Sequence, residues 1–127
     1  MLYSILIYGS EERIAQWTAD QEQEVLGRHA TLRRDLEAAG RLGPVIRLTP
    51  NSLRTVRRYK ERNYITDGPF IEAKEQLMGL YVVDCASLDD AVACTERLSF
   101  ETSSFEISEL SWVTPGVVQP FVSGDYG

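Results

Sequence analysis

His29 is the only histidine of this 127-residue chain, and histidine is the side chain best suited to carry a proton near neutral pH. It belongs to the stripe Val25, His29, Leu32 and Leu36, whose spacing is that of one face of a helix. A position on that stripe directs the ring toward the interior. His29 is therefore either a core histidine satisfied by one hydrogen bond or a general acid/base in a pocket.

Asp67 is the carboxylate that we pair with His29 as a catalytic candidate, and it opens the turn Asp67-Gly-Pro-Phe70. Aspartate can bond to its own backbone ahead, glycine accepts a positive φ and proline fixes the next φ, so the turn has a purely structural explanation. The functional alternative is that Asp67 orients a proton-transferring group or a substrate. Phe70 would then be a wall of the substrate pocket.

Five basic residues fall close together in a chain that is acidic as a whole: Arg54, Arg57, Arg58, Lys60 and Arg62. One interpretation is a solvated hairpin edge whose charges discourage aggregation. The other is an anion-binding rim, at which Arg57 receives the carboxylate of a small molecule. Tyr8, at the end of the first apolar run, is the remaining candidate for substrate binding. A small anionic ligand is thus an expected partner.

The sequence gives no sign of a metal, a cofactor or a covalent nucleophile. A single histidine with scattered carboxylates lacks the spacing of metal ligands, and the isolated glycines form no phosphate-binding loop. Cys85 and Cys94 have no activating base nearby in sequence, and we interpret them as small buried apolar residues. We therefore expect any chemistry to be cofactor-free.

Charge and composition limit the partners and the compartment. The chain has 19 acidic against 13 basic residues, and its net charge of -6 repels phosphate backbones and anionic lipid, so nucleic acid is not an expected partner. The apolar run from Leu2 to Tyr8 is too short to span a membrane and lacks a basic leader region. With two cysteines, a reducing compartment is the simplest context. We expect a cytoplasmic protein.

The apolar patterns predict four strands, two helices and one small hairpin. We expect strands at residues 2–8, 45–48, 77–85 and 105–113, helices over 18–39 and from 87 onward, and hairpin arms at 53–59 and 63–66. Thr18 and Gln21 form a capping-box pattern at the start of the first helix, and Gly40 suits a left-handed C-cap. Without the hairpin, the order is that of an α+β, ferredoxin-like split βαβ fold.

Such a fold places both helices on one face of an antiparallel sheet and leaves the other face open. A chain of this length has no third layer to cover that face. We therefore predict a homodimer through the sheet face, because an uncovered sheet would expose a large apolar surface. Residues 1–113 form the predicted domain. Residues 114–127 form a C-terminal extension that we expect to lie in an extended conformation on the partner subunit.

The run from Thr66 to Asp84, TDGPFIEAKEQLMGLYVVD, resembles the signature of the YCII-related (DGPF) family. The resemblance extends from Leu2 to about Val113. The wider family carries a helical histidine followed eleven residues later by Gly-Arg-Leu, and His29 precedes Gly40-Arg-Leu42 in the same way.

The resemblance implies a dimeric α+β barrel of ferredoxin-like subunits, with a site that pairs the histidine with an acidic residue. Most members are uncharacterised, a few are linked to small-molecule chemistry such as lactone dehalogenation, and others are associated with extracytoplasmic sigma factors. Two hypotheses follow. One is a cofactor-free enzyme that performs acid/base chemistry, an isomerisation or an elimination, on a small organic acid. The alternative is a non-catalytic module that binds a small molecule or a partner and serves regulation.

Overall fold

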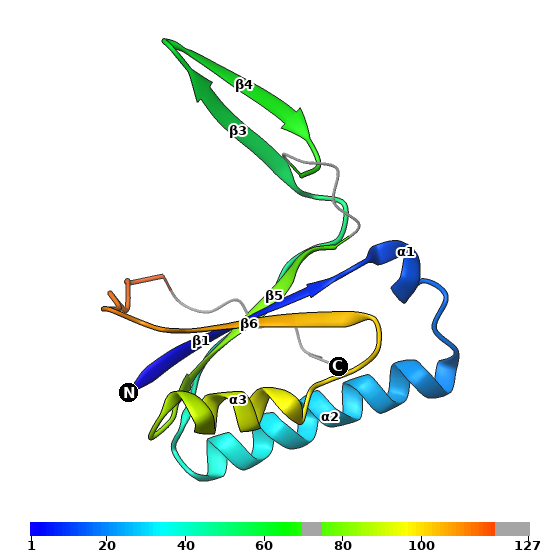
Figure 1. The fold of residues 1–127 in the computed structure, drawn as a ribbon, viewed down its shortest axis with the longest axis vertical. Helices are drawn as coiled ribbons and strands as arrows, with labels where there is room; N and C mark the ends of the chain where they lie inside the picture. The colour runs from blue at the N-terminus through cyan, green and yellow to red at the C-terminus, as the bar shows by residue number, and fades with distance from the viewer. Residues whose placement is uncertain (70–74, 119–127) are drawn as a thin grey trace.

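The computed structural model describes residues 1–69 and 75–118, and its elements form one antiparallel sheet with the two longer helices on one side and a projecting hairpin (Figure 1). The elements in chain order are β1 (Leu2–Gly9), α1 (Glu11–Ile14), α2 (Ala19–Ala38), β2 (Leu42–Arg47), β3 (Arg54–Tyr59), β4 (Arg62–Asp67), β5 (Gln76–Asp84), α3 (Leu88–Glu96) and β6 (Ser103–Glu109).

The main sheet has the strand order β2-β5-β1-β6, and every pair in it is antiparallel. Each of the units β1-α2-β2 and β5-α3-β6 carries its helix between two strands that are not neighbours, which is the split βαβ arrangement. The predicted α+β, ferredoxin-like fold is confirmed. So is the central position of β5, whose apolar character reflects two neighbouring strands and burial.

The core lies between the sheet and the long helices α2 and α3. Alternate residues of the two central strands point to the helices, as the two-residue period of a strand requires. The buried apolar side chains are Tyr3, Ile5, Leu32, Leu36, Tyr81, Val83, Cys85, Ala91 and Leu98. The odd-numbered residues of β1 and the matching residues of β5 therefore define the helix-covered face of the sheet.

The ends of α2 follow the predicted capping signals. The Thr18 side chain accepts from the Gln21 backbone N–H, the Gln21 side chain accepts from the Thr18 N–H, and the capping box is complete. Gly40 has a φ of 70°, the left-handed conformation in which glycine is favoured after a helix. Both boundaries lie within one residue of those predicted.

Two strands have bounds that differ from the sequence-based expectations by three or more residues at one end, and one short helix was not expected. β2 begins at Leu42 because the chain pairs with β5 across an irregularity between Leu42 and Val45. The last strand covers 103–109 and pairs with β1 as far as Glu109, so the apolar residues after it are not part of the sheet. The short helix α1 was not predicted, because one turn capped by Ser10 is too short to show a helical apolar period.

β3 and β4 form a separate two-stranded sheet, which we call the arm (residues 54–67), and which projects from the body in Figure 1. The arm confirms the predicted hairpin, with Arg54 opposite Asp67 at its base and Tyr59 opposite Arg62 at its tip. Gly68 follows with a φ of 83°, as the predicted turn requires, and its N–H donates to the Leu53 carbonyl.

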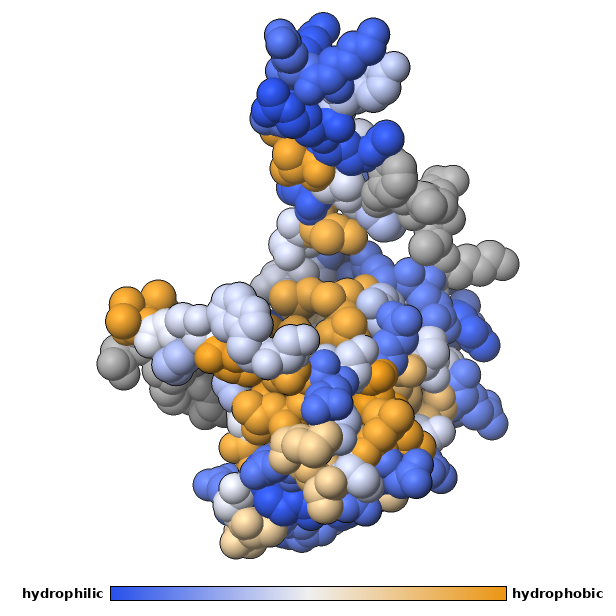
Figure 2. All heavy atoms as spheres, turned by 60° about the vertical axis from the view of Figure 1, so that its left-hand side comes forward, coloured by the Kyte–Doolittle hydropathy of each residue, from blue (hydrophilic) through white to orange (hydrophobic). Residues whose placement is uncertain are grey.

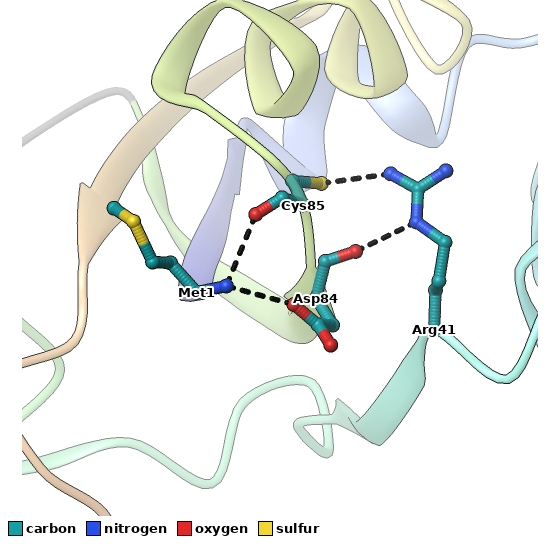
Figure 3. A network of polar contacts seen from close by, with 4 residues as sticks. All are labelled: Met1, Arg41, Asp84 and Cys85. Carbon is teal, nitrogen blue, oxygen red and sulfur yellow. Dashed lines mark hydrogen bonds and ion pairs between the residues drawn. The ribbon is translucent and has the colours of Figure 1, made fainter.

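Arg41 ties the start of β2 to the end of β5, as Figure 3 shows. Its Nε donates to the Asp84 carbonyl oxygen at 2.7 Å, and its Nη2 donates to the Cys85 sulfur at 3.3 Å. The Met1 amino group lies 2.9 Å from an Asp84 carboxylate oxygen and 3.2 Å from the Cys85 carbonyl. Strand β1 is thereby fixed to β5 at the same corner of the sheet.

The face of the sheet away from the helices carries apolar side chains from three strands. The register aligns Leu6 with Leu80 and Leu80 with Ile46, and Val82 lies two residues along β5 on the same face. Ile46 is 45% exposed. Figure 2 shows hydrophobic side chains gathered on the part of the body that it presents, below an arm whose tip is hydrophilic. Among the described residues, no helix is long and apolar enough to cross a membrane.

Candidate functional site

His29 lies between α2 and the sheet, where its ring meets Tyr81. The distance from His29 Nδ1 to the Tyr81 hydroxyl oxygen is 2.8 Å, and the ring centroids are 5.7 Å apart. Tyr81 is 1% exposed and stands on the helix-covered face of β5, and the histidine ring is half-buried. The predicted inward orientation of His29 is confirmed, and its hydrogen-bond partner is the hydroxyl group of Tyr81.

The histidine is neutral at physiological pH. Burial and, to a smaller extent, the positive charges of Arg33 and Arg47 together lower the pKa of His29 from 6.5 to about 4. Arg33 lies one helical turn after His29 on the same face of α2. Arg47 is two residues beyond Val45, which pairs with Tyr81, so Arg47 projects to the helix-covered side.

Tyr81 connects the ring to one of these arginines. Burial raises the pKa of Tyr81 above its ordinary value, and a hydrogen bond from Arg33 opposes that shift. Since the guanidinium only donates, the Tyr81 oxygen accepts from Arg33 and its proton is directed to His29 Nδ1. This order of hydrogen bonds favours the His29 tautomer that carries its proton on Nε2.

We call His29, Arg33, Arg47 and Tyr81 the histidine cluster. It contains two permanent positive charges and a neutral ring, and its members supply donors in the form of guanidinium N–H groups and an Nε2–H. Such a set matches a carboxylate, which accepts several charge-assisted hydrogen bonds. A bound anion would also offset the charges that depress the pKa of His29, and would so bring the ring closer to protonation near neutral pH.

Asp67, the second catalytic candidate, lies in a different part of the molecule from His29. Asp67 is 86% exposed at the base of the arm and forms an ion pair with Arg54, with 2.9 Å between Asp67 Oδ1 and Arg54 Nε. Arg57 is in the middle of β3, opposite Tyr64. Phe70 lies outside the described residues. Within residues 1–69 and 75–118, no hydrogen bond joins Asp67 to His29.

Tyr8 is on the opposite face of the sheet from the histidine cluster. It pairs with Leu77 beyond an irregularity in β1 and with Ser104 of β6. A hydrogen bond to Glu106 and burial raise the pKa of Tyr8. Since Glu106 pairs with Leu6, the tyrosine and the carboxylate share the face on which the apolar residues lie open. The structure therefore does not bring Tyr8 and His29 together in one subunit.

Two surface cavities lie elsewhere. One of about 240 Å³ is bounded by Glu11 of α1, by residues 48–54 and by Gln76–Met78 at the start of β5. The other, an open groove of about 540 Å³, is lined by Gln21, Glu24, Arg28, Ser99, Phe100 and Glu101. Neither is lined by a member of the histidine cluster. The first touches the base of the arm through Arg54, the ion-pair partner of Asp67.

Sequence reasoning found His29 but not the three residues around it. Arg33 was within reach, because it lies four positions after His29 in a predicted helix. Tyr81 and Arg47 depend on which face each strand position occupies, and the irregularity between Leu42 and Val45 changes that assignment. Among the described residues, no group of three or more potential ligands could hold a metal ion.

The strand order and the two helices that cover one face of the sheet define a ferredoxin-like α+β protein. A model of the YCII-related domain matches residues 1–111 of the chain. A relative, the uncharacterized protein R00369 of Rhizobium meliloti (strain 1021), is 38% identical over 120 residues, which are 91% of this chain and 97% of the relative. This chain belongs to the YCII-related family.

Proposed function

We propose that this protein binds a small organic acid at the histidine cluster and moves a proton on it without a cofactor. The observation that carries the proposal is the hydrogen bond between His29 Nδ1 and the Tyr81 hydroxyl, which fixes the ring beside two arginines. The guanidinium groups of Arg33 and Arg47 bind the carboxylate. The bound charge raises the pKa of His29, so the ring exchanges a proton with the substrate at Nε2.

The single histidine makes the binding step directly measurable. The ring protons of His29 are followed by NMR as a function of pH in acetate, benzoate or succinate, and in sodium chloride of the same ionic strength. We expect the carboxylates to raise the pKa of His29 from about 4, and chloride to leave it low. An unchanged titration in all three carboxylates contradicts the proposed anion site.

Arginine variants supply the matched control. Arg33→Gln removes a charge next to the ring and should raise the pKa of His29 even without an added anion. Arg34→Gln removes an equal charge from the next, exposed position of α2 and should leave the pKa unchanged. If both variants have the same effect, the influence of Arg33 is general electrostatics and not a local contact.

The catalytic step has its own test. The protein is incubated in D2O with panels of small carboxylic acids, and loss of the signal of the C–H next to the carboxyl or carbonyl group reports proton transfer. His29→Gln should abolish exchange that the parent protein accelerates. Acceleration that survives this substitution would exclude His29 as the proton carrier.

A non-catalytic binding module is the second candidate, and one observation favours it. His29 is neutral and half-buried, and its Nδ1 already has a hydrogen-bond partner in the Tyr81 hydroxyl. In that case carboxylates shift the His29 titration, but no acid exchanges its protons faster. The two experiments together therefore separate an enzyme from a binding protein.

We also propose that the chain is a homodimer through the open face of the sheet. The support is the apolar alignment of Leu6, Leu80 and Ile46 on that face, because such a surface is stabilised by burial. Ile46→Glu, on an edge strand, should shift the sedimentation coefficient to that of a monomer.

The cysteines Cys85 and Cys94 are both free thiols, which supports a cytoplasmic, reducing environment.

A further inference from the structure

The arm exposes apolar side chains that no other described part of the chain covers. Val56 and Ile65 face each other across β3 and β4, and they are 63% and 69% exposed. Tyr59 at the tip is 63% exposed. A directly opposed apolar pair is the unit that normally stabilises a sheet face by being buried, yet here it faces solvent.

The arm is also an isolated two-stranded ribbon. It pairs with no strand of the main sheet, and every residue of β4 is exposed. A hairpin without a third strand or a covering helix is marginally stable in water. Contact with a surface outside its own subunit would therefore stabilise the arm.

Charge indicates what that surface is. Residues 54–67 contain five basic and two acidic residues, whereas the remainder of the chain contains eight basic and seventeen acidic ones. The ion pair Arg54–Asp67 lies at the base. Near the tip, Lys60 and Arg62 lie over the rings of Tyr59 and Tyr64, at 5.5 and 5.7 Å from the ring centroids. The distal arm therefore presents positive charge beside apolar surface.

The acidic complement is the body of the same chain. Helix α2 has Asp20 and Glu22 in its first turn, α3 has Asp89 and Asp90, and neither has a basic residue in its last turn. Basic and acidic surfaces on one molecule attract between copies, and attraction of this kind orients association. We propose that the arm of one subunit docks on the acidic body of a second copy, with Val56 and Ile65 buried at the contact.

This contact is independent of the proposed activity and adds a surface to the dimer proposed above. An RNA strand is the competing occupant, since arginine and tyrosine side chains also suit nucleic acid. The apolar Val56–Ile65 pair and the acidic body both favour a protein surface, because a phosphate backbone is repelled by that body.

The test uses the full chain and sedimentation velocity over a range of concentration and salt. The double variant Val56→Ser/Ile65→Ser should weaken self-association by about tenfold or more, because it removes the apolar centre of the contact. Raising sodium chloride from low to high concentration should also weaken self-association of the parent chain, since exposed charges are screened. Trp112→Ser/Val113→Ser, at two apolar residues that are 77% and 51% exposed and lie outside both the arm and the C-terminal extension, is the matched control and should have no effect.

Each result supports or overturns the inference. Unchanged self-association of the arm variant, with a circular dichroism spectrum like that of the parent, contradicts it. Binding of a mixed-sequence RNA oligonucleotide that the arm variant loses, by a chain that stays monomeric, assigns the arm to nucleic acid instead. The sheet-face dimer fails separately, when Ile46→Glu leaves association intact while the arm variant weakens it.

Discussion

The hydroxyl oxygen of Tyr81, on the central strand β5, lies 2.8 Å from Nδ1 of His29 on helix α2. Because the tyrosine is buried, removal of its hydroxyl leaves the imidazole nitrogen without a partner in a site that water reaches poorly. Tyr81→Phe should therefore lower the free energy of unfolding by about 1–3 kcal/mol. Urea denaturation of the variant measures this loss.

Tyr3→Phe is the control for that substitution. Tyr3 is also 1% exposed and pairs with Val83 on the same face of the sheet. Among the described residues its hydroxyl forms no hydrogen bond, so its loss should cost less than that of Tyr81. Equal destabilisation by the two variants would show that the contact with His29 contributes nothing specific.

Acid should destabilise the fold through His29 over a defined range of pH. The folded ring has a pKa of about 4 and the unfolded ring one near 6.5, so between these values the unfolded chain binds a proton that the folded chain does not. Stability is therefore lost as the pH falls from about 6.5 to about 4, by up to about 3 kcal/mol.

The carboxylates of the protein titrate in the lower part of the same range, so the difference from His29→Gln isolates the histidine. Denaturation midpoints are measured for both proteins at several pH values. The difference in denaturation midpoint between the parent protein and His29→Gln should be smallest in acid and largest near neutral pH. A gap that does not depend on pH contradicts the lowered pKa of His29.

Substitution by alanine should destabilise the protein at Gly79 and stabilise it at Gly27. A Cβ at Gly79 would lie 2.4 Å from the Ile46 carbonyl oxygen, which belongs to the backbone of the paired strand. Gly79→Ala must therefore move β2 and should cost more than about 2 kcal/mol. At Gly27, within α2, nothing lies within 4 Å of such a Cβ, and Gly27→Ala should stabilise by about 0.5–1 kcal/mol. Thermal melts distinguish these outcomes, and a tolerated Gly79→Ala would contradict the close approach of β2 to β5.

Replacement of Arg41 by either methionine or lysine should lower the stability of the protein. Its planar group donates in two directions, to the Asp84 carbonyl and to the Cys85 sulfur, and a single ammonium does not reproduce that geometry. We expect each substitution to cost about 1 kcal/mol in chemical denaturation. Arg34→Met, at an exposed position of α2, is the control and should change stability by less than about 0.5 kcal/mol. Full stability in Arg41→Lys would mean that charge alone matters at this corner.

The fold was predictable because its signals are local. The Thr18 capping box, the helical stripe through His29 and the apolar run of β5 each specify an element from neighbouring residues, and their order defines the split βαβ arrangement. The inward orientation of His29 followed from the same stripe. These features do not depend on how the strands are aligned.

The surroundings of His29 were not predictable in the same way. Tyr81 lies 52 positions away and reaches the ring only because of the register between β2, β5 and β1. The pairing with Asp67 was inferred from the turn alone, and the turn lies at the base of the arm, where Asp67 meets Arg54. A one-residue shift of register turns a side chain to the other face, so contacts between distant strands exceed what one sequence specifies.

Strands β2 and β5 are paired with each other, and the Leu48 N–H still donates to the Met78 carbonyl. The segment between the two strands, including the arm, is thus the connection of a single β-hairpin that a short turn could close. The free energy of closing a loop grows only slowly with its length. Residues 49–75 therefore form an insertion between two paired strands, and shortening that segment in this chain should leave the sheet and the histidine cluster in place.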